Sequence, residues 1–282
     1  MSISIRVLSD ADLDVADAIL KSAFQRAESR VEDLRLYRRI QPDGWFLASQ
    51  HGSPVGIVGT KIYAAFAYVG SMAVHQDAQR QGVGFALMEY LLAWLDSRGV
   101  GLVLLDASEI GQTLYQKLGF VAYDRTYVFR RRRIMQFQQP SRLVQAVSVR
   151  ELDELIAWDA SAFGAPRPDV LHALLAAFPG RAFMVREERN EVAGYLFAQP
   201  NRIGPWVAQR SQDAEVLLQA ALSLPYDNPV SVVVPEVNQC AVALLTRYGF
   251  ESVRTNRHMG RGASTSSRQR ENIYGQTSLG MG

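Results

Sequence analysis

The sequence predicts an α/β protein made of two related domains in tandem. Its 282 residues exceed what one compact core usually holds, and a typical domain of roughly 150 residues suggests two domains. Segments with the two-residue periodicity of strands alternate with segments that have the 3.6-residue periodicity of helices. The same order of segments restarts near residue 144. We therefore expect a first domain over residues 1–135, a linker over 136–143, which is rich in Gln and contains Pro140, and a second domain over 144–282.

The first half begins with a strand and two helices. Apolar and polar residues alternate in Ile3–Leu8, which predicts a strand. Ser9 and Asp10 offer an N-cap to a helix over Asp12–Phe24, and a charged helix over Val31–Ile40 stops before Pro42. The segments that follow predict strands and helices in the order strand, strand, strand, helix, strand, helix, strand: Trp45–Gln50, Val55–Ile62, Ala67–Val74, Gly84–Arg98, Gly101–Asp106, Thr113–Leu118 and Phe120–Phe129.

Four segments of the second half echo segments of the first half in the same order, which favours duplication over chance. These are Val144–Phe163 with Ile3–Phe24, Ile203–Ala208 with Val69–Val74, Val230–Val234 with Leu102–Leu105, and Leu244–Phe250 with Leu114–Phe120. The last ten residues return to apolar character and are expected to dock as a strand, whereas residues 260–272 look flexible.

Composition narrows the class of protein. Apolar residues make up 48% and charged residues 21% of the chain, and the net charge is +2, which does not imply a nucleic-acid partner. A single cysteine, Cys240, excludes an intramolecular disulfide and a Cys-based zinc site, and its spacing predicts burial. No signal peptide and no apolar run of ~20 residues is found. We expect a cytoplasmic protein with no metal and no membrane partner.

The segment Gln79-Arg80-Gln81-Gly82-Val83-Gly84 predicts a site for a diphosphate. It joins a strand to the N-terminus of an amphipathic helix, where unpaired N–H groups and the helix dipole favour an anion. Its two glycines let the backbone approach the ligand, and Arg80 adds a positive charge. A dinucleotide fingerprint would need a third glycine where Leu87 stands, and no Gly-Lys-Ser/Thr triplet follows for a P-loop.

These residues resemble the Gln/Arg-x-x-Gly-x-Gly/Ala signature of the GNAT superfamily of N-acetyltransferases. Leu114-Tyr115, followed by Gly119-Phe120, resembles the second signature of that family. The resemblance covers about residues 3–133, and the second half is similar to the degenerate second domain of tandem GNAT proteins. It implies two GNAT-like domains, each a mixed, mostly antiparallel sheet flanked by helices.

The resemblance also implies a site for acetyl-CoA. The pyrophosphate would lie on the N–H groups of residues 79–84, and the pantetheine arm would pair with the strand at Met72, Ala73 and Val74. Tyr115 would lie near the thioester sulfur. Many members carry Asn and Ala at positions where this chain has Ser108 and Gly111, and we keep Ser108 as a candidate cofactor-binding residue. The second half has no glycine in residues 210–214 and has Leu245 in place of the tyrosine, so it is expected to wall the acceptor pocket without binding acetyl-CoA.

Transfer to an amine with a pKa of about 10.4 requires deprotonation, because only about one amine in 10³ is neutral at pH 7. Asp106 is the first candidate for the general base, followed by Glu109, although Asp106 is also suited to capping the following turn. Tyr115 is the candidate donor of a proton, or of a hydrogen bond, to the leaving thiolate. The N–H of Val74 is the family's usual oxyanion donor, with His75 beside it.

The acceptor itself stays open. A primary amine of a small molecule is the favoured acceptor, a protein N-terminus or lysine is the alternative, and a non-catalytic acetyl-CoA-binding regulatory module is a third reading. Acidic residues at Glu28, Glu32 and Asp33 suit a cationic acceptor or an ordinary exposed helix. The run Arg130–Arg133 is interpreted as a solvated strand end. A homodimer is left open.

Overall fold

The chain forms one continuous sheet with helices on both faces. The structure, a computed structural model, describes residues 3–131, 144–187, 189–226, 229–263 and 268–282. The predicted linker, 136–143, lies outside the described residues. Among those that are described, no helix combines the length and apolar character needed to cross a membrane.

The elements of the first half follow the predicted order. They are β1 (Ile3–Val7), α1 (Leu13–Phe24), α2 (Val31–Ile40), β2 (Trp45–Gln50), β3 (Ser53–Ile62), β4 (Ala67–Val74), α3 (Val83–Asp96), β5 (Leu102–Ala107), α4 (Glu109–Lys117) and β6 (Val121–Arg131). Periodicity located these elements to within a few residues. The largest difference is α4, which starts four residues before the predicted Thr113 because Ser108 caps it, accepting a hydrogen bond from the N–H of Gly111.

The second half repeats this order. Its elements are β7 (Val144–Ala146), α5 (Leu152–Phe163), α6 (Pro168–Ala177), β8 (Ala182–Arg186), β9 (Val192–Gln199), β10 (Arg202–Ala208), α7 (Ser211–Leu222), β11 (Ser231–Pro235), α8 (Gln239–Arg247), β12 (Phe250–Gly262) and β13 (Ile273–Gly275). The expected return of the last residues as a strand is confirmed by β13. The expectation of flexibility for 260–272 is wrong where the structure describes it, because residues 260–262 end β12 and Arg270 begins a 3₁₀ turn.

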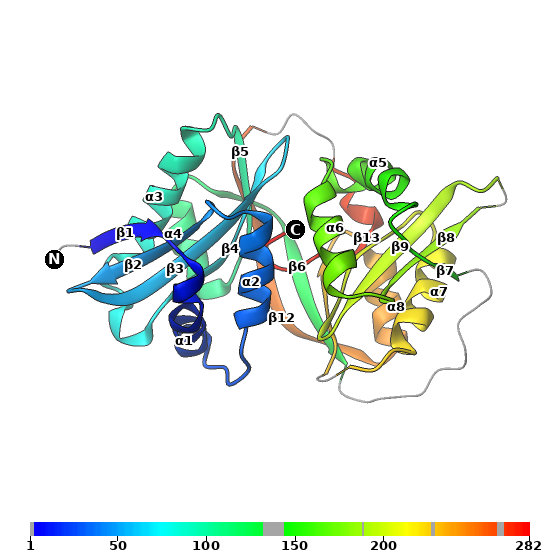
Figure 1. Cartoon of the computed structure of the whole chain (residues 1–282), viewed down its shortest axis with the longest axis horizontal. Coiled ribbons are helices and arrows are strands. Elements are labelled where there is room, and N and C mark those ends of the chain that lie inside the picture. The colour runs from blue at the N-terminus through cyan, green and yellow to red at the C-terminus, as the bar shows by residue number, and fades with distance from the viewer. Residues whose placement is uncertain (1–2, 132–143, 188, 227–228, 264–267) are drawn as a thin grey trace.

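The two halves exchange their long strands. The sheet order is β1-β2-β3-β4-β5-β12-β6-β11-β10-β9-β8-β7, with β13 paired to β10. Strand β12 therefore lies between β5 and β6, and β6 lies against β11 of the second half. Figure 1 shows β6 and β12 running between the two halves. The halves share one sheet instead of forming the two separate sheets that the tandem pattern suggests.

Three apolar cores cover this sheet. One core joins α1 and α2 to α5 and α6 on one face and contains Tyr68 and Tyr195. On the opposite face, α3 covers the first half through residues such as Leu87 and Leu91, and α7 and α8 cover the second half. Alternate residues of each strand point to opposite faces, so Leu104 enters the shared core. The two halves are thus joined by side chains as well as by strands.

Residues 276–282 lie between the two halves, where Figure 1 marks the C-terminal end. The hydroxyl of Tyr63 donates to the carbonyl of Met281 at 2.7 Å. The buried guanidinium of Arg167 donates to Asp159 at 2.7 Å and to the Thr277 hydroxyl at 2.9 Å. These bonds hold the segment against β4, with consequences for the site below.

Candidate active site

The turn before α3 has the main-chain geometry of an anion site. Arg80 has φ 59° and Gly82 has φ 85°, so the chain enters the left-handed region twice within three residues. Such conformations turn successive N–H groups toward one side. Among the described residues no acceptor bonds to the N–H groups of Gly82, Val83 and Gly84. A Cβ on Gly82 would have no atom within 4 Å, so the turn is open to solvent at this point.

Strand β4 separates from β5 just beyond this turn. The two strands pair in parallel from Ala67 to Val69, and no pairing follows beyond Val69. Ser71, with φ 50°, begins an irregularity that bends β4. The N–H of His75 bonds to Val55 of β3, so the N–H of Val74 points the other way, into the cleft. Met72 and Val74 therefore present an edge that β5 does not use, and the Val74 carbonyl on that edge accepts from the Gln79 side chain at 3.1 Å, whereas Ala73 pairs with Ile57 of β3.

Tyr115 reaches the same cleft from α4. Its ring packs against Phe120 at 5.8 Å, and the residue is buried. No described group forms a hydrogen bond with its hydroxyl, and burial raises the pKa of Tyr115 well above its usual value. The hydroxyl stays protonated at neutral pH and can donate. Ser108 also lines the cleft, where its side chain caps α4.

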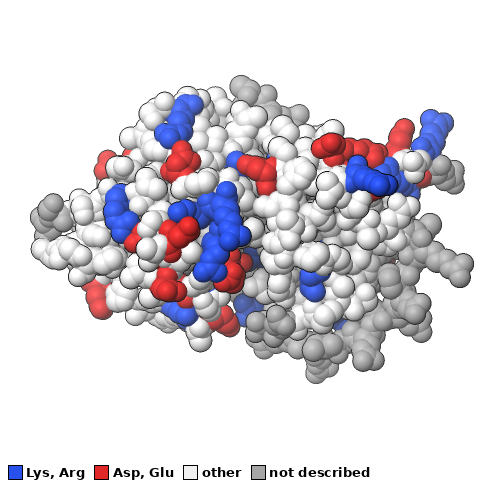
Figure 2. Space-filling view, in the orientation of Figure 1, with Lys and Arg blue, Asp and Glu red and all other residues white. Residues whose placement is uncertain are grey.

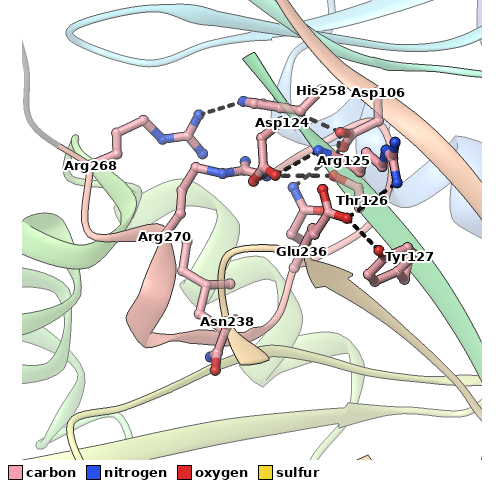
Figure 3. A network of polar contacts seen from close by, with 12 residues as sticks. Asp106, Asp124, Arg125, Thr126, Tyr127, Glu236, Asn238, His258, Arg268 and Arg270 are labelled. Carbon is pink, nitrogen blue, oxygen red and sulfur yellow. Dashed lines mark hydrogen bonds and ion pairs between the residues drawn. The ribbon is translucent and has the colours of Figure 1, made fainter. Parts of the chain in front are cut away.

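Asp106 is the centre of a buried polar network (Figure 3). Its carboxylate accepts hydrogen bonds from Thr126 at 2.7 Å, from the hydroxyl of Tyr68 and from Gln276 at 3.3 Å, and it lies 3.1 Å from Nδ1 of His258. Burial alone would raise its pKa, but the hydrogen bonds and charges of His258, Arg270 and Tyr68 outweigh burial and lower the pKa of Asp106 to about 2. The carboxylate is ionised and its oxygens are occupied.

The network joins the two halves of the chain through His258 of β12 and the arginines that follow it. Nε2 of His258 lies 3.5 Å from a guanidinium nitrogen of Arg268, and burial together with Arg270 lowers the pKa of His258. Arg270 also lies 3.4 Å from Asp124 of β6. Sequence reasoning missed both His258, whose meeting with Asp106 depends on β12 lying beside β5, and Tyr68, which reaches Asp106 from the neighbouring strand β4.

A cavity of about 180 Å³ joins these parts. Tyr115, Ser108, Met72 and Asp106 line it on the side of β4 and β5, and Ser278–Gly280 close it. Gly70 and Gly280 touch, since a Cβ on Gly70 would lie 2.1 Å from Cα of Gly280. Its other lining residues include five arginines from both halves of the chain: Arg26, Arg30, Arg130, Arg202 and Arg254.

Several residues that the sequence singled out either do not line this cavity or differ from the prediction in their burial or charge partners. Glu109 is exposed at the start of α4 and does not line the cavity, and His75 caps a 3₁₀ turn. Asp33 is paired with arginines, so the acidic helix does not make the cavity acidic.

The interpretation of Arg130–Arg133 as a solvated strand end is wrong for the described part, since Arg130 lines the cavity and Arg131 is buried. The prediction of burial is wrong for Cys240, which is exposed.

Comparison with known families matches both halves of the chain. Residues 14–120 match the acetyltransferase (GNAT) family, and residues 155–275 match a second acetyltransferase (GNAT) domain. The chain is a GNAT N-acyltransferase with two GNAT domains. The family implies an acyl-CoA cosubstrate.

Some of the similar proteins match this chain along most of its length, and others match only a part of it. The chain is 25% identical over 256 residues to holothin acyltransferase of a Pseudoalteromonas species, covering 89% of this chain and 85% of that protein. It is 35% identical to the ribosomal protein bS18-alanine N-acetyltransferase of Escherichia coli, but over 27% of this chain and 53% of the relative. A crystal structure assigned as an acetyltransferase from Pyrococcus horikoshii superposes with a TM-score of 0.87 at 27% identity, covering 99% of this chain and 96% of that one.

The second GNAT domain has a strand where the first has a cleft. Strands β10 and β11 pair at Arg202 and Ile203 and then separate, as β4 and β5 do. Strand β13 pairs with β10 at Trp206 and Val207, and the N–H of Gln276 bonds to Val233 of β11 at 2.8 Å. Asn238, which stands where the first domain has Ser108, donates to the carbonyl of Ile273 at 3.1 Å. The chain itself therefore fills the second cleft.

Proposed function

We propose that this GNAT protein transfers an acetyl group from acetyl-CoA to the primary amine of a small molecule, in a ternary complex at the cleft between β4 and β5. The observation that carries the proposal is that the edge of β4 left unpaired by β5 and the Tyr115 hydroxyl, which has no partner among the described residues, meet in one cavity next to the turn 79–84. Gly84 of that turn faces Met72 of the cavity wall, since a Cβ on Gly84 would lie 3.0 Å from the Met72 methyl.

The residues present suit acetyl-CoA. The N–H groups of Gly82, Val83 and Gly84, with the side chains of Gln79, Arg80 and Gln81 around them, would hold the pyrophosphate. The main chain of Met72, Ala73 and Val74 would pair with the pantetheine amides, and Ser108 would border them. When bound, acetyl-CoA supplies the acyl group as a thioester.

The transfer forms an amide C–N bond and breaks the thioester C–S bond. Tyr115 donates its hydroxyl proton, or a hydrogen bond, to the departing sulfur. The N–H of Val74 points into the cleft and can stabilise negative charge on the carbonyl oxygen. We assign Asp106 to positioning and not to proton transfer, because its oxygens are occupied and its pKa of about 2 makes it a weak base. The amine proton then passes to water in the cavity, and Tyr115 regains from that water any proton that it gave to the sulfur.

Two observations favour a small acceptor over a polypeptide. The second GNAT domain contributes Arg202, Ser231 and Val233 to the cavity wall, and Ser278–Gly280 close it. A relative that covers most of both chains is named for acyl transfer to holothin, a small molecule. The similarity to the bS18-alanine N-acetyltransferase covers 27% of this chain, against 89% for the holothin relative.

Tyr115→Phe tests the proposal. The variant should lower turnover by about 10- to 100-fold and change acetyl-CoA affinity by less than about threefold, because the lost group acts on the leaving sulfur. The measurement is thiol release from acetyl-CoA with a panel of small amines, beside calorimetric binding of acetyl-CoA. Acetyl-CoA binding without thiol release for any amine would instead favour a regulatory module.

A further inference from the structure

The cavity that contains Tyr115 is strongly positive on its acceptor side. Arg26 and Arg30 come from the segment between α1 and α2, Arg130 from β6, Arg254 from β12 and Arg202 from β10. On the face drawn in Figure 2, by contrast, basic and acidic side chains lie side by side over the first half. The concentration of one sign in the cavity therefore needs a separate explanation.

Two of the five arginines already have a counter-ion. Asp33 lies 2.8 Å from Arg30 and 3.4 Å from Arg202, and Arg202 also donates to the hydroxyl of Tyr37 at 2.8 Å. Burial alone would raise the pKa of Asp33, but the charges of Arg202 and Arg30 outweigh burial and lower that pKa. These two arginines form the fixed base of the cluster.

The other three, Arg26, Arg130 and Arg254, have no ion pair or side-chain hydrogen bond with any residue that the structure describes. The Nε atoms of Arg130 and Arg254 are buried without an acceptor. Glu251 is the cross-strand neighbour of Arg130, and no ion pair joins them. A buried donor without a partner costs free energy, which suggests that these guanidinium groups face a ligand.

None of the described residues that line the cavity forms an ion pair with these three arginines. Asp106 is the sole carboxylate among the described cavity-lining residues, and its oxygens accept from Thr126, Tyr68 and Gln276. Burial, followed by the charges of Arg26 and Arg30, lowers the pKa of Arg254 to about 10. Like charges are thus held close together without neutralisation, a situation that a bound anion would relieve.

We propose that the acceptor carries an anionic group, a carboxylate or a phosphate, and that Arg130 and Arg254, with Arg26 at the rim, bind that group. This inference rests on the proposed function, since it names the class of amine that is acylated. The planar guanidinium groups are suited to pairing with carboxylate and phosphate oxygens. The anion on the arginines would direct the amine toward Tyr115.

The same cluster assists the chemistry. A positive field disfavours a protonated amine, so the arginines lower the pKa of the acceptor's ammonium group. A lower pKa raises the fraction of the acceptor amine that is neutral and able to attack. This matters here because Asp106, the carboxylate of the cavity, is occupied by hydrogen bonds and is not available as a base. A phosphate of acetyl-CoA is the less suitable occupant, because no residue of the turn 79–84 lines this cavity.

Matched acceptors test the inference. Ethanolamine, β-alanine and O-phosphoethanolamine differ in a neutral, carboxylate or phosphate end, and phenethylamine and phenylalanine differ in a carboxylate beside the amine. We expect kcat/KM, from thiol release with acetyl-CoA, to be at least about tenfold higher for the anionic members of a series. The carboxylate and phosphate arms identify which anion is preferred.

Variants locate the preference. Arg254→Met and Arg130→Met should lower activity toward anionic amines at least about tenfold more than they lower activity toward neutral amines, because only the anionic amines lose a direct ion pair. Arg26→Met, at an exposed residue, should act in the same direction without disturbing the sheet. Arg257→Met is the matched control, because Arg257 lies on β12 with its side chain on the opposite face from Arg254 and does not line the cavity.

Binding to the protein saturated with coenzyme A separates this inference from the proposed function. Saturation-transfer NMR with the same amines should show the anionic preference in the wild type and its loss in Arg254→Met, even without turnover. The inference is overturned by equal binding of neutral and anionic amines, by an equal loss for both classes in Arg254→Met, or by a loss confined to acetyl-CoA affinity. Failure of thiol release with the binding preference intact would overturn the proposed function alone.

Discussion

Single residues of the site adopt main-chain conformations that few side chains tolerate. Ser71, Arg80 and Gly82 all have positive φ, and the first two are not glycine. A non-glycine residue in this region costs of order 1 kcal/mol, and such residues are concentrated at functional sites. Here they bend β4 away from β5 and direct N–H groups outward, so the strain has an identifiable use.

Gly82→Ala should weaken coenzyme A binding by about tenfold. The added methyl meets no protein atom, so the loss would come from strain at φ 85° and from obstruction of the anion. Gly52→Ala is the matched control, because Gly52 has φ 78°, meets no atom either, and lies in the β2–β3 hairpin. Calorimetric titration should show similar losses of stability in both variants and weakened binding in the first; equal affinities would contradict the assigned role.

Asp106→Asn should affect stability more than the pH profile of turnover. The folded pKa of about 2 lies below the unfolded value of about 3.9, so the carboxylate stabilises the fold by about 2 kcal/mol above pH 4. That stability disappears as the pH falls from about 4 to about 2. Thermal unfolding at pH 7 and pH 3 should show a smaller acid effect in the variant than in the wild type or in Asp14→Asn, at an exposed site. A hundredfold loss of kcat with a changed acid limb would identify Asp106 as the general base.

At the scale of elements, the two GNAT domains use the same separation of strands in different ways. In the first domain no described strand pairs with β4 on the β5 side beyond Val69, and in the second domain β13 pairs with the equivalent edge of β10. Tyr274 of β13 packs on Trp206 at 5.1 Å, which fastens the strand in place. A strand that bonds to both β10 and β11 leaves no edge for a pantetheine arm.

We therefore expect one acetyl-CoA per chain. Calorimetric titration of the whole protein should give a stoichiometry of one, since the second cleft is closed by main-chain hydrogen bonds. In Gly82→Ala the same titration should show a single weakened site. A stoichiometry of two, or a tight site that survives this substitution, would show that the second domain also binds acetyl-CoA.

At the scale of the whole molecule, the exchange of β6 and β12 makes each half incomplete alone. Residues 1–135 would contain β5 without β12 beside it and β6 without β11, leaving unpaired strand edges. The polar network crosses the same boundary, since Asp106 contacts His258 and Gln276. The shared core of α1, α2, α5 and α6 adds apolar contacts between the halves.

A truncation to residues 1–135 should be insoluble or unfolded, and the full chain should unfold in one cooperative transition. Co-expression of 1–137 with 144–282 should restore a soluble complex, because the exchanged strands then find their partners. Co-purification and differential scanning calorimetry measure these outcomes. A soluble truncation with full activity would contradict both the shared sheet and the role of the second domain in the acceptor site.

Local features of the sequence predicted most of the elements. Of the residues that line the cavity, they also drew attention to Met72, Asp106, Ser108 and Tyr115. Periodicity predicted α2 and β4 to the residue, and the glycine pattern indicated the turn at 79–84. The sequence drew attention to Arg130 as part of a basic run. However, no feature of the neighbouring sequence distinguishes a strand residue that faces a cavity from one that faces solvent. Arg254 and His258 carry no motif, and they reach the site through β12.

The sequence by itself determined the family and the tandem order of domains, and it predicted the turn and the tyrosine that we propose for acetyl-CoA, because those depend on neighbours along the chain. The tertiary structure decided which strands complete each sheet, what fills the second cleft and which charges meet in the acceptor cavity. These features depend on contacts between residues more than a hundred positions apart, such as Asp106 and His258. The periodicity of the sequence carries no information about such contacts. The proposed site for acetyl-CoA is therefore predictable from segments of the first half alone, whereas the proposed acceptor site forms only after both halves have folded together.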